Sequence, residues 1–421
     1  MKPGLKTGAA IGMIDLEEDF QASLDALFKK LKEHQNTIFP NVDLPYTGLT
    51  LECDVSGKTA DVMYRYYNVD GKPEVRMIAA EVKAKIVGAK YAIEKNKEIY
   101  KDVLGDEFEF CKDINNIGYK NGESYICVIH IDGNNMGLKF NCCANMEERK
   151  ELSMNIASAV KTAFKRLVSK IIKDYDGYSD ILDMQGLTDS GKKILPIRPI
   201  IIGGDDITFV CPGKLGLEYA STFMKEVSRI EISKNSNFMK ALRARIGKNA
   251  SKSMSCCAGV AIVPAKYPFF RAYELAEQLC SSAKALSRES DGFYLDFAIL
   301  HGEMYADLAT LRREQYTSIC GNLHYGPYEV VKGKVRSLGK LMRLRDVLLE
   351  LPSNKQKELR RVLHEDLHSQ QIFLEHCEEF CSVFAQLGKN KDANAEQLWE
   401  KLDDTNVTKL MDAIEIIDFT Y

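Results

Sequence analysis

The chain has 421 residues, of which 45% are hydrophobic, and its 57 basic and 60 acidic residues give a net charge of −3. This balance excludes a global positive field of the kind that dominates sequence-independent nucleic-acid binding, although a local basic groove is compatible with it. A chain of this length exceeds one ordinary hydrophobic core, so we expect a folded protein of several domains.

The sequence also bears on the cellular compartment. No run approaches the ~18 apolar residues that span a bilayer, and the segment MKPGLKTGAAIGMIDLEEDF meets acidic residues too early for a signal peptide. The 12 cysteines include two adjacent pairs and form no CxxC motif. We therefore expect a cytoplasmic protein with reduced thiols and no membrane partner.

Residues 1–120 predict an N-terminal α/β domain. The hydrophobic pattern favours a strand over Ala10–Leu16, a helix through Leu24–Leu31, a strand at VMYRYYNV and a long helix from about Val75 to Tyr100. The polar stretch CKDINNIGYKNGES that follows is typical of a linker.

Residues 121–302 predict a second domain. The run YICVIHID, from Tyr125 to Asp132, suits a buried central strand, and Asn145 with Glu148 suits the start of a long helix. The strands IRPIII and ITFV flank the turn GGDD, and a helix near Leu217–Ile230, the strand SCCAGVAIV and a further helix follow. The order β-α-β-β-α-β is that of a ferredoxin-like split βαβ fold.

Residues 303–421 predict an all-helical C-terminal domain, with a long helix from Lys355 to about Leu387. This segment contains HEDLH, in which His364, Glu365 and His368 match the HExxH pattern of zinc proteases. Charged neighbours and the lack of a clear third ligand favour a chance match.

The stretch IIIGGDDITFV places Asp205 and Asp206 between two apolar runs. One interpretation is an ordinary hairpin turn, in which glycine and aspartate are common residues. The other follows from the topology, because the end of the central strand, at Asp132, lies beside that hairpin in a split βαβ sheet. The three carboxylates would then converge and repel one another unless a cation bound them.

A hard divalent cation, Mg²⁺ or Mn²⁺, would relieve this repulsion, since both prefer oxygen ligands and keep positions open for phosphates. We expect Asp132, Asp205 and Asp206 to be the catalytic metal ligands, together with the carbonyl group of Gly133. Gly203 and Gly204 would let a nucleotide approach the turn closely. The amides that follow Gly133, those of Asn134 and Asn135 among them, would meet metal and phosphate.

IDGNNMG, GGDD and the downstream CAGVAIVPAKYPFFRAYELAEQLCSSAK together resemble the catalytic palm domain of the large polymerase/cyclase subunit of type III CRISPR effectors, a family related to GGDEF nucleotidyl cyclases. The resemblance covers roughly residues 120–300. It implies a nucleotidyltransferase that converts nucleoside triphosphates, ATP above all, into cyclic oligonucleotides in antiviral defence. It also implies that Lys284 in SSAKAL holds the triphosphate; an exposed helix lysine is the alternative.

The chain departs from that family in two ways. It contains no His-Asp dipeptide, so we expect it to lack the family's HD nuclease domain. The family also carries two palms, and the N-terminal strand ending at Asp15 would open only a degenerate first palm, because no second GGDD accompanies it. Whether RNA or an effector complex is a partner therefore stays open.

Two classes of function, enzyme and scaffold, stay open. The first is a metal-dependent enzyme, in which a second nucleotide site is supplied by a homodimer or by the N-terminal domain. Within the enzyme class, the alternatives to an oligonucleotide cyclase are a simpler cyclase that acts within one nucleotide and a GGDEF-like dinucleotide synthase. The second is a non-catalytic scaffold that keeps the palm in order to bind nucleotide or RNA–protein partners.

Overall fold

The computed structural model describes most of the chain, in several stretches. The described residues are 20–37, 51–67, 73–112, 114, 117, 125–180, 182, 191–333, 335–377, 380, 394–402 and 404–420. The chain divides into two compact units, Met1–Gly105 and Asp106–Tyr421. Within the described stretches, no helix has the length and apolar character needed to cross a membrane.

The first unit combines helices with a hairpin. Its described elements are α1 (Phe20–Thr37), β1 (Val62–Tyr67), β2 (Pro73–Ile78), α2 (Ala80–Ile99) and α3 (Lys101–Leu104). The helix expected through Leu24–Leu31 and the strand at VMYRYYNV are confirmed over their described residues. The long helix, however, begins at Ala80 and not at Val75, because residues 73–78 pair antiparallel with β1. The strand expected over Ala10–Leu16 lies outside the described residues.

The second unit is built around a six-stranded sheet, in the order β10-β9-β8-β4-β7-β6. The strands are β4 (Tyr125–Gly133), β6 (Arg198–Gly203), β7 (Asp206–Pro212), β8 (Cys256–Pro264), β9 (Tyr294–Ile299) and β10 (Tyr328–Glu329). The connecting helices are α4 (Met136–Phe140), α5 (Met146–Lys173), α6 (Gly216–Ser228), α7 (Ser236–Ile246) and α8 (Phe269–Ser290). The segments β4-α5-β6-β7-α6-β8 thus form the expected split βαβ fold, with β4 in the middle.

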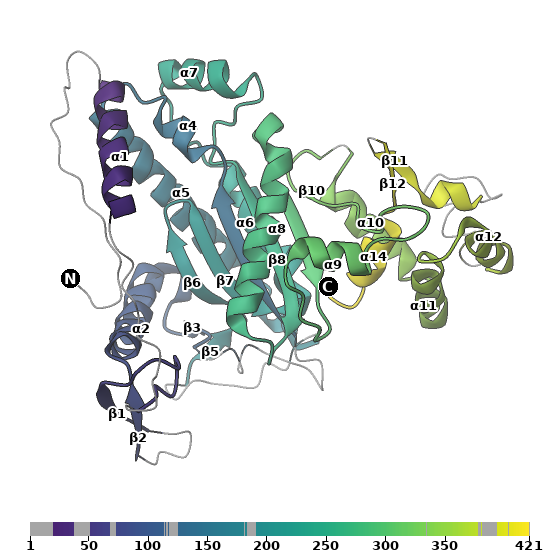
Figure 1. The fold of residues 1–421 in the computed structure, drawn as a ribbon, viewed down its shortest axis with the longest axis horizontal. Coiled ribbons are helices and arrows are strands. Elements are labelled where there is room, and N and C mark those ends of the chain that lie inside the picture. The colour runs from purple at the N-terminus through teal and green to yellow at the C-terminus, as the bar shows by residue number, and fades with distance from the viewer. Residues whose placement is uncertain are drawn as a thin grey trace. The chain divides into compact units, whose positions relative to one another are not determined.

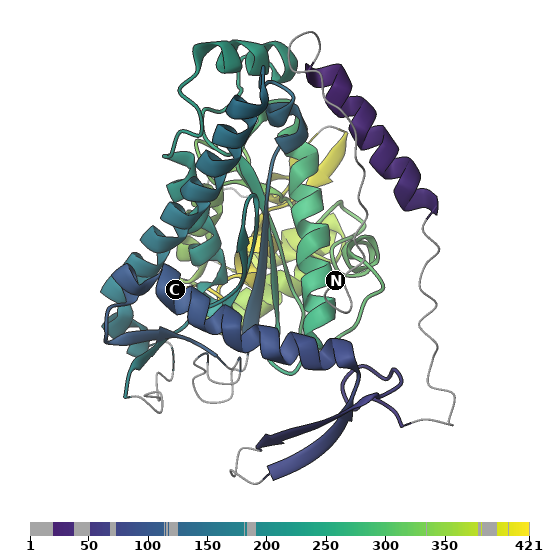
Figure 2. The same cartoon turned by 90° about the vertical axis from the view of Figure 1, so that its left-hand side faces the viewer.

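Helices cover both faces of this sheet (Figure 1). α5 packs on α6, which contacts β4, β7 and β8, while α8 packs on β4, β8 and β9. Figure 2 shows the strands between α5 on one side and α8 on the other. β4 is buried from Ile126 to Ile131, which explains why its sequence is an almost continuous apolar run.

Some elements of the second unit have weak signals in the sequence. α7 comes between α6 and β8 along the chain, and β9 pairs parallel with β8. The apolar run of β9 is interrupted by Asp296, which is buried. The strands β3 (Phe108–Phe110) and β5 (Lys193–Leu195) pair parallel, but three residues are too few to show a period of two. The short 3₁₀ helices η2 (Tyr175–Asp180), η3 (Gly213–Leu215) and η4 (Ala395–Leu398) complete the connections.

The expectation of a wholly helical region after residue 303 is wrong, because β10 joins the palm sheet and β11 pairs with β12. The elements are α9 (Leu308–Gln315), α10 (Leu338–Leu348), α11 (Ser353–Val362), α12 (Leu367–His376), β11 (Glu400–Leu402), β12 (Thr405–Val407) and α14 (Leu410–Glu415). These strands have two or three residues each, so the helical pattern dominates the sequence.

The long helix expected from Lys355 to Leu387 is also wrong over its described part. The chain leaves α11 after Val362, and Asp366 starts α12 by accepting a hydrogen bond from the backbone N–H of Ser369 at 2.8 Å. His364 and His368 fall on opposite sides of this break, so the HExxH pattern does not occupy one helix face. This break supports the interpretation of the HExxH pattern as a chance match.

A buried ionic cluster ties the palm to the C-terminal helices. His324 lies between two buried carboxylates, with Nε2 2.9 Å from Asp296 Oδ1 and Nδ1 2.8 Å from Asp412 Oδ1. Arg312 also donates to Asp296, at 2.9 Å, and Tyr328 donates to Asp412 at 2.5 Å. Because Asp296 belongs to β9 and Asp412 to α14, the cluster fixes these two elements together.

Charges in this cluster shift one another's pKa values. Burial alone would raise the pKa of Asp296, but Arg312 and His324 lower it to about 2. Burial and Arg312 would lower the pKa of His324, but Asp412 and Asp296 raise it above its ordinary value of 6.5. The two carboxylates therefore stabilise the imidazolium form of His324.

We predict that the free energy of unfolding falls as the pH rises above 6.5, the ordinary pKa of histidine, because a raised folded-state pKa of His324 gives stability that is lost as the pH passes through it. The stability that ionised Asp296 contributes is lost only as the pH falls toward about 2, so Asp296 does not affect the pH dependence above pH 6. His324→Gln should cost about 3–5 kcal/mol near pH 6 and flatten this dependence. Urea unfolding at several pH values measures both effects.

The matched control is His368→Gln, which replaces an exposed histidine. It should change the free energy of unfolding by less than about 0.5 kcal/mol and leave the pH dependence intact. A wild-type stability that stays constant across this pH range would contradict the prediction.

Candidate nucleotide and metal site

The register of β4 and β7 sets the geometry of the candidate site. The two strands pair antiparallel from Ile126↔Pro212 to Asp132↔Asp206, so the last pair places two carboxylates directly opposite each other. Like charges in this position destabilise a sheet. The convergence of Asp132 with Asp206 that the topology predicts is therefore present.

The GGDD segment forms a two-residue hairpin turn, because Gly203 pairs with Asp206 and leaves Gly204 and Asp205 between them. Gly204 has φ +60°, which suits the first central position of such a turn. A Cβ at Gly203 or Gly204 would meet no atom within 4 Å, so the space beside the turn is open.

Gly133 brings the turn against the end of β4. Its N–H donates to the carbonyl oxygen of Asp205 at 3.0 Å. A Cβ on Gly133 would lie 2.8 Å from Asp205 Cβ, which is closer than such atoms pack. The absence of a side chain at Gly133 therefore allows the turn residue Asp205 to pack against the end of β4.

Asp206 is under electrostatic strain. Burial raises its pKa, His130 opposes that effect, and Asp132, Asp205 and Glu277 raise the pKa further. Its Oδ1 atom is buried and accepts no hydrogen bond from the described residues; His130 Nδ1 lies 3.6 Å away. His130 in turn lies 3.3 Å from Thr208 Oγ1 and packs edge-on against Tyr273.

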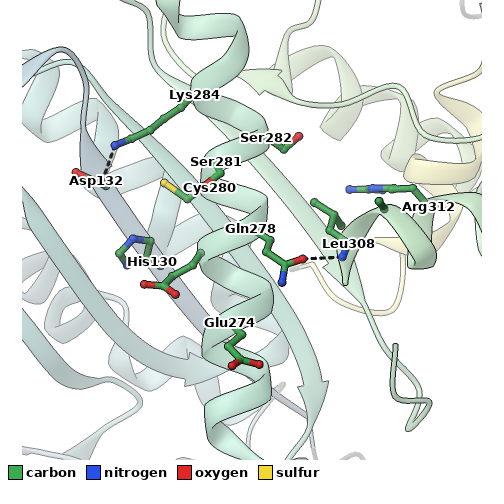
Figure 3. Close-up of a pocket in the computed structure, with 12 residues that line it drawn as sticks. His130, Asp132, Glu274, Gln278, Cys280, Ser281, Ser282, Lys284, Leu308 and Arg312 are labelled. Carbon is green, nitrogen blue, oxygen red and sulfur yellow. Dashed lines mark hydrogen bonds and ion pairs between the residues drawn. The ribbon is translucent and has the colours of Figure 1, made fainter. Parts of the chain in front are cut away.

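Lys284 of α8 reaches Asp132, with its Nζ 2.5 Å from Oδ2 (Figure 3). The two side chains are 30% and 34% exposed, so solvent reaches the pair. They border a cavity of about 830 Å³. Its lining residues are His130, Asp132, Glu274, Glu277, Gln278, Cys280, Ser281, Ser282, Lys284, Leu308, Ala309 and Arg312.

The loop after Asp132 is held by a buried ion pair that sequence reasoning missed. Lys139, which is fully buried, donates to the carbonyl of Asn134 at 2.7 Å and lies 3.4 Å from Asp291 Oδ1. Asn135, which has φ +56°, donates a hydrogen bond from its side-chain amide to Asp291 Oδ1 at 3.1 Å. The hydroxyl of Ser255 also donates to Asp291 Oδ1, at 2.6 Å. Burial lowers the pKa of Lys139, while Asp291 opposes that shift.

Asn134 and Asn135 thus have structural partners in addition to the phosphate role expected of them. Asn134 donates its side-chain amide to the carbonyl of Gly292 at 2.9 Å and its backbone N–H to Ser255. The one sequence signal for Asp291 was its place before Gly292, where a helix ends. Nothing in the sequence distinguishes Lys139 from an exposed lysine.

The carboxylates offer a partial metal site. Across the stretches that the structure describes, no group of three or more His, Cys, Asp or Glu side chains is arranged to hold a metal ion. Lys284 already compensates Asp132, which accounts for part of this difference from the expected three-aspartate site. The buried, unpartnered Oδ1 of Asp206 nevertheless fits a hard cation, for which carboxylate oxygen is the preferred ligand.

We predict that Asp206→Asn unfolds at the same temperature as the wild type or a higher one when no metal is present. A raised folded-state pKa means that ionised Asp206 costs stability at neutral pH, and asparagine removes the charge. Thermal unfolding in chelator measures this effect. Asp106→Asn, at an exposed aspartate of the same unit, should leave the unfolding temperature unchanged; destabilisation by Asp206→Asn alone would contradict the prediction.

Comparison with known proteins supports the assignment of the fold. Residues 125–291 match the family model of the second palm domain of Cas10/Cmr2. No curated protein matches the chain. The matched range runs from the start of β4 to the end of α8 and contains the β4–β7 pair, the GGDD turn and Lys284. Residues 125–291 therefore carry a domain that is similar to the second palm of Cas10/Cmr2.

Proposed function

We propose that the palm condenses nucleoside triphosphates, with ATP favoured, into cyclic oligonucleotides, with Mg²⁺ or Mn²⁺ as cofactor. One observation carries this proposal: Asp132 and Asp206 face each other across β4 and β7, and one buried oxygen of Asp206 has no partner among the described residues. A structural turn would gain nothing from this repulsion, whereas a cation site requires such oxygens.

The reaction is a nucleotidyl transfer. The 3′-oxygen of one nucleotide forms a bond with the α-phosphorus of another, the bond to the β-phosphate oxygen breaks, pyrophosphate leaves and the hydroxyl proton passes to solvent. A divalent ion held by Asp132, Asp205 and Asp206 would activate the hydroxyl and stabilise the charge that develops on the phosphate. The open space beside Gly203 and Gly204 leaves room for the nucleotide.

Lys284 has two roles in this proposal. Without ligand it neutralises Asp132. With a nucleotide bound it would turn to the triphosphate, and Asp132 would then be available to hold a divalent cation. The partial exposure of Lys284 keeps the cost of this exchange low, because surface ion pairs are worth only about 0–1 kcal/mol. A cavity of about 830 Å³ beside Lys284 supports the proposal of a triphosphate site there.

The condensation needs a second nucleotide beside the first. We propose that a homodimer or the first unit provides it and that the chain works in the cytoplasm within a CRISPR effector complex that contains RNA. The palm assignment supports a place in type III CRISPR systems.

A non-catalytic scaffold is favoured by one observation, the ion pair that already compensates Asp132. In such a protein Lys284 would replace the metal permanently. Nucleotide would then stabilise the fold without being turned over, so the two functions differ in a measurable result.

The test is incubation of the full chain with labelled ATP, GTP, CTP and UTP in Mn²⁺ or Mg²⁺, with and without added RNA, followed by product mass analysis. We expect pyrophosphate release and cyclic products with ATP. Asp205→Asn and Asp206→Asn should each reduce the rate at least about 100-fold, because ligands of a catalytic metal contribute several kcal/mol. Asp106→Asn should keep the wild-type rate. Stabilisation by nucleotide without pyrophosphate release would establish the scaffold.

Substitution of Lys284 by methionine separates its two roles. We expect Lys284→Met to lower kcat/KM about 10-fold to 100-fold, mainly through KM, because a charge-assisted hydrogen bond contributes about 1.5–3 kcal/mol. Lys266→Met, at an exposed lysine before α8, should have no effect. An unchanged KM in Lys284→Met would show that this lysine does not hold the triphosphate.

A further inference from the structure

A basic surface covers α7 and its flanking residues. We define it by Lys234, Lys240, Arg243, Arg245 and Lys248, all of which are exposed. Not one of the five forms an ion pair with a described residue, whereas the neighbouring Lys252 pairs with Glu231 at 3.3 Å. The sequence holds no aspartate or glutamate from residue 232 to 273, although the whole chain has a net charge of −3.

Packing explains why these charges face solvent. α7 buries Phe238, Met239 and Leu242, and this apolar side leaves Lys240 and Arg243, three residues apart, together on the outside. Asn235 caps the helix by accepting hydrogen bonds from the N–H groups of Asn237 and Phe238. The helix is therefore a fixed support for the basic side chains.

The basic surface lies next to the candidate site. α7 packs against α4, the helix that follows the loop after Asp132 (Figure 1). Arg245 is close enough to Cys142 to oppose the rise in the thiol's pKa that burial causes. Ser251, three residues after Lys248, donates its N–H to Asp291 at 2.9 Å, and Asp291 also holds Asn135.

The negative charge around the aspartates means that a polyanion would have to bind to basic residues outside the candidate site. Asp132, Asp205, Asp206 and Glu277 repel phosphodiester groups, and Lys284 is paired with Asp132. A nucleotide strand that grows at this site would need basic side chains next to the acidic site to hold its phosphates. Lysine and arginine contacts to phosphate supply such attraction without reading the bases.

We propose that the basic surface holds the backbone of a single-stranded oligoribonucleotide, the acceptor or product strand of the palm site. This inference rests on the proposed function, because that reaction produces ribonucleotide phosphodiesters. The strand lies along α7 and α4, and its 3′ end reaches Asp132.

Binding of a fluorescent ten-residue oligoadenylate to the full chain, without metal or nucleotide, tests the docking surface. The triple variant Lys240→Glu, Arg243→Glu, Lys248→Glu should bind at least about 10-fold more weakly at low salt. The slope of log affinity against log salt should decrease in magnitude by up to about 2, since each contact to a single strand contributes about 0.7.

The matched control is Lys161→Glu, Lys225→Glu, Lys266→Glu, which makes the same charge change at three exposed lysines outside the basic surface. It should retain most of the affinity and the salt slope. Equal losses in both variants, or no binding by the wild type, would overturn the proposal. Equal unfolding temperatures for the two variants would exclude misfolding as the cause.

Two further measurements separate this inference from the proposed function. Asp206→Asn should bind the oligonucleotide as the wild type does, even though its rate of product formation is reduced at least about 100-fold. With ATP and Mn²⁺, the variant of the basic surface should form the first phosphodiester at the wild-type rate but release shorter products. An unchanged product length would overturn the role in strand docking, whereas the absence of any product would count only against the proposed function.

Discussion

The pairing of β4 with β7 is the constraint on which the candidate site depends. A two-residue turn fixes Gly203 opposite Asp206, and the ladder then fixes Asp206 opposite Asp132. Side chains alternate between the faces of a strand, so a slip by one residue would turn Asp132 toward the side of the sheet where Phe164 meets Phe209. A carboxylate buried among those rings would be far more costly than two carboxylates at an open edge.

The rest of the palm tolerates this local repulsion because its strands are otherwise well buried. β4 and β8 are apolar along almost their whole length, and α6 and α8 pack on them. Lys139 and Asp291 add a buried tie between the loop after Asp132 and the end of α8, the helix that carries Lys284. Asp132 and Lys284, which face each other at the site, are thus held in place by the buried strands and by the Lys139–Asp291 pair, neither of which depends on a ligand.

The parts of this arrangement that the sequence predicts are those set by local pattern and topology. An apolar run ending in Asp132, a Gly-containing turn and a β-α-β-β-α-β order were enough to bring Asp132 to Asp206. The contact of Lys284 with Asp132 was not predictable, because the rotation of α8 on the sheet depends on packing. Lys139 was missed for a related reason: only tertiary structure shows that its ammonium group is buried against Asp291.

Other elements were hard to predict because a local signal competed with a longer pattern. Residues 73–78 continue into an alanine- and lysine-rich helix, yet they pair with β1. The periodicity of α11 and α12 suggests one helix, yet Asp366 satisfies the N–H of Ser369 and starts a new one. In β9 the buried Asp296 breaks the apolar run that marks a parallel strand, and its partners Arg312 and His324 come from later in the chain.

Burial distinguishes the ion pairs that hold the fold from those that can change partner. Lys139 and Asp291 are fully buried, and Asp296 and Asp412 are almost so, which means that loss of either partner would leave an uncompensated charge in a dry environment. Lys284 and Asp132 are about one-third exposed, and the side chain of Asp206 is 47% exposed. Water can compensate these groups while they separate. The palm therefore concentrates its exchangeable charges at the end of β4, where a cation and a phosphate can replace them without disturbing the buried pairs that keep the loop and the C-terminal helices in place.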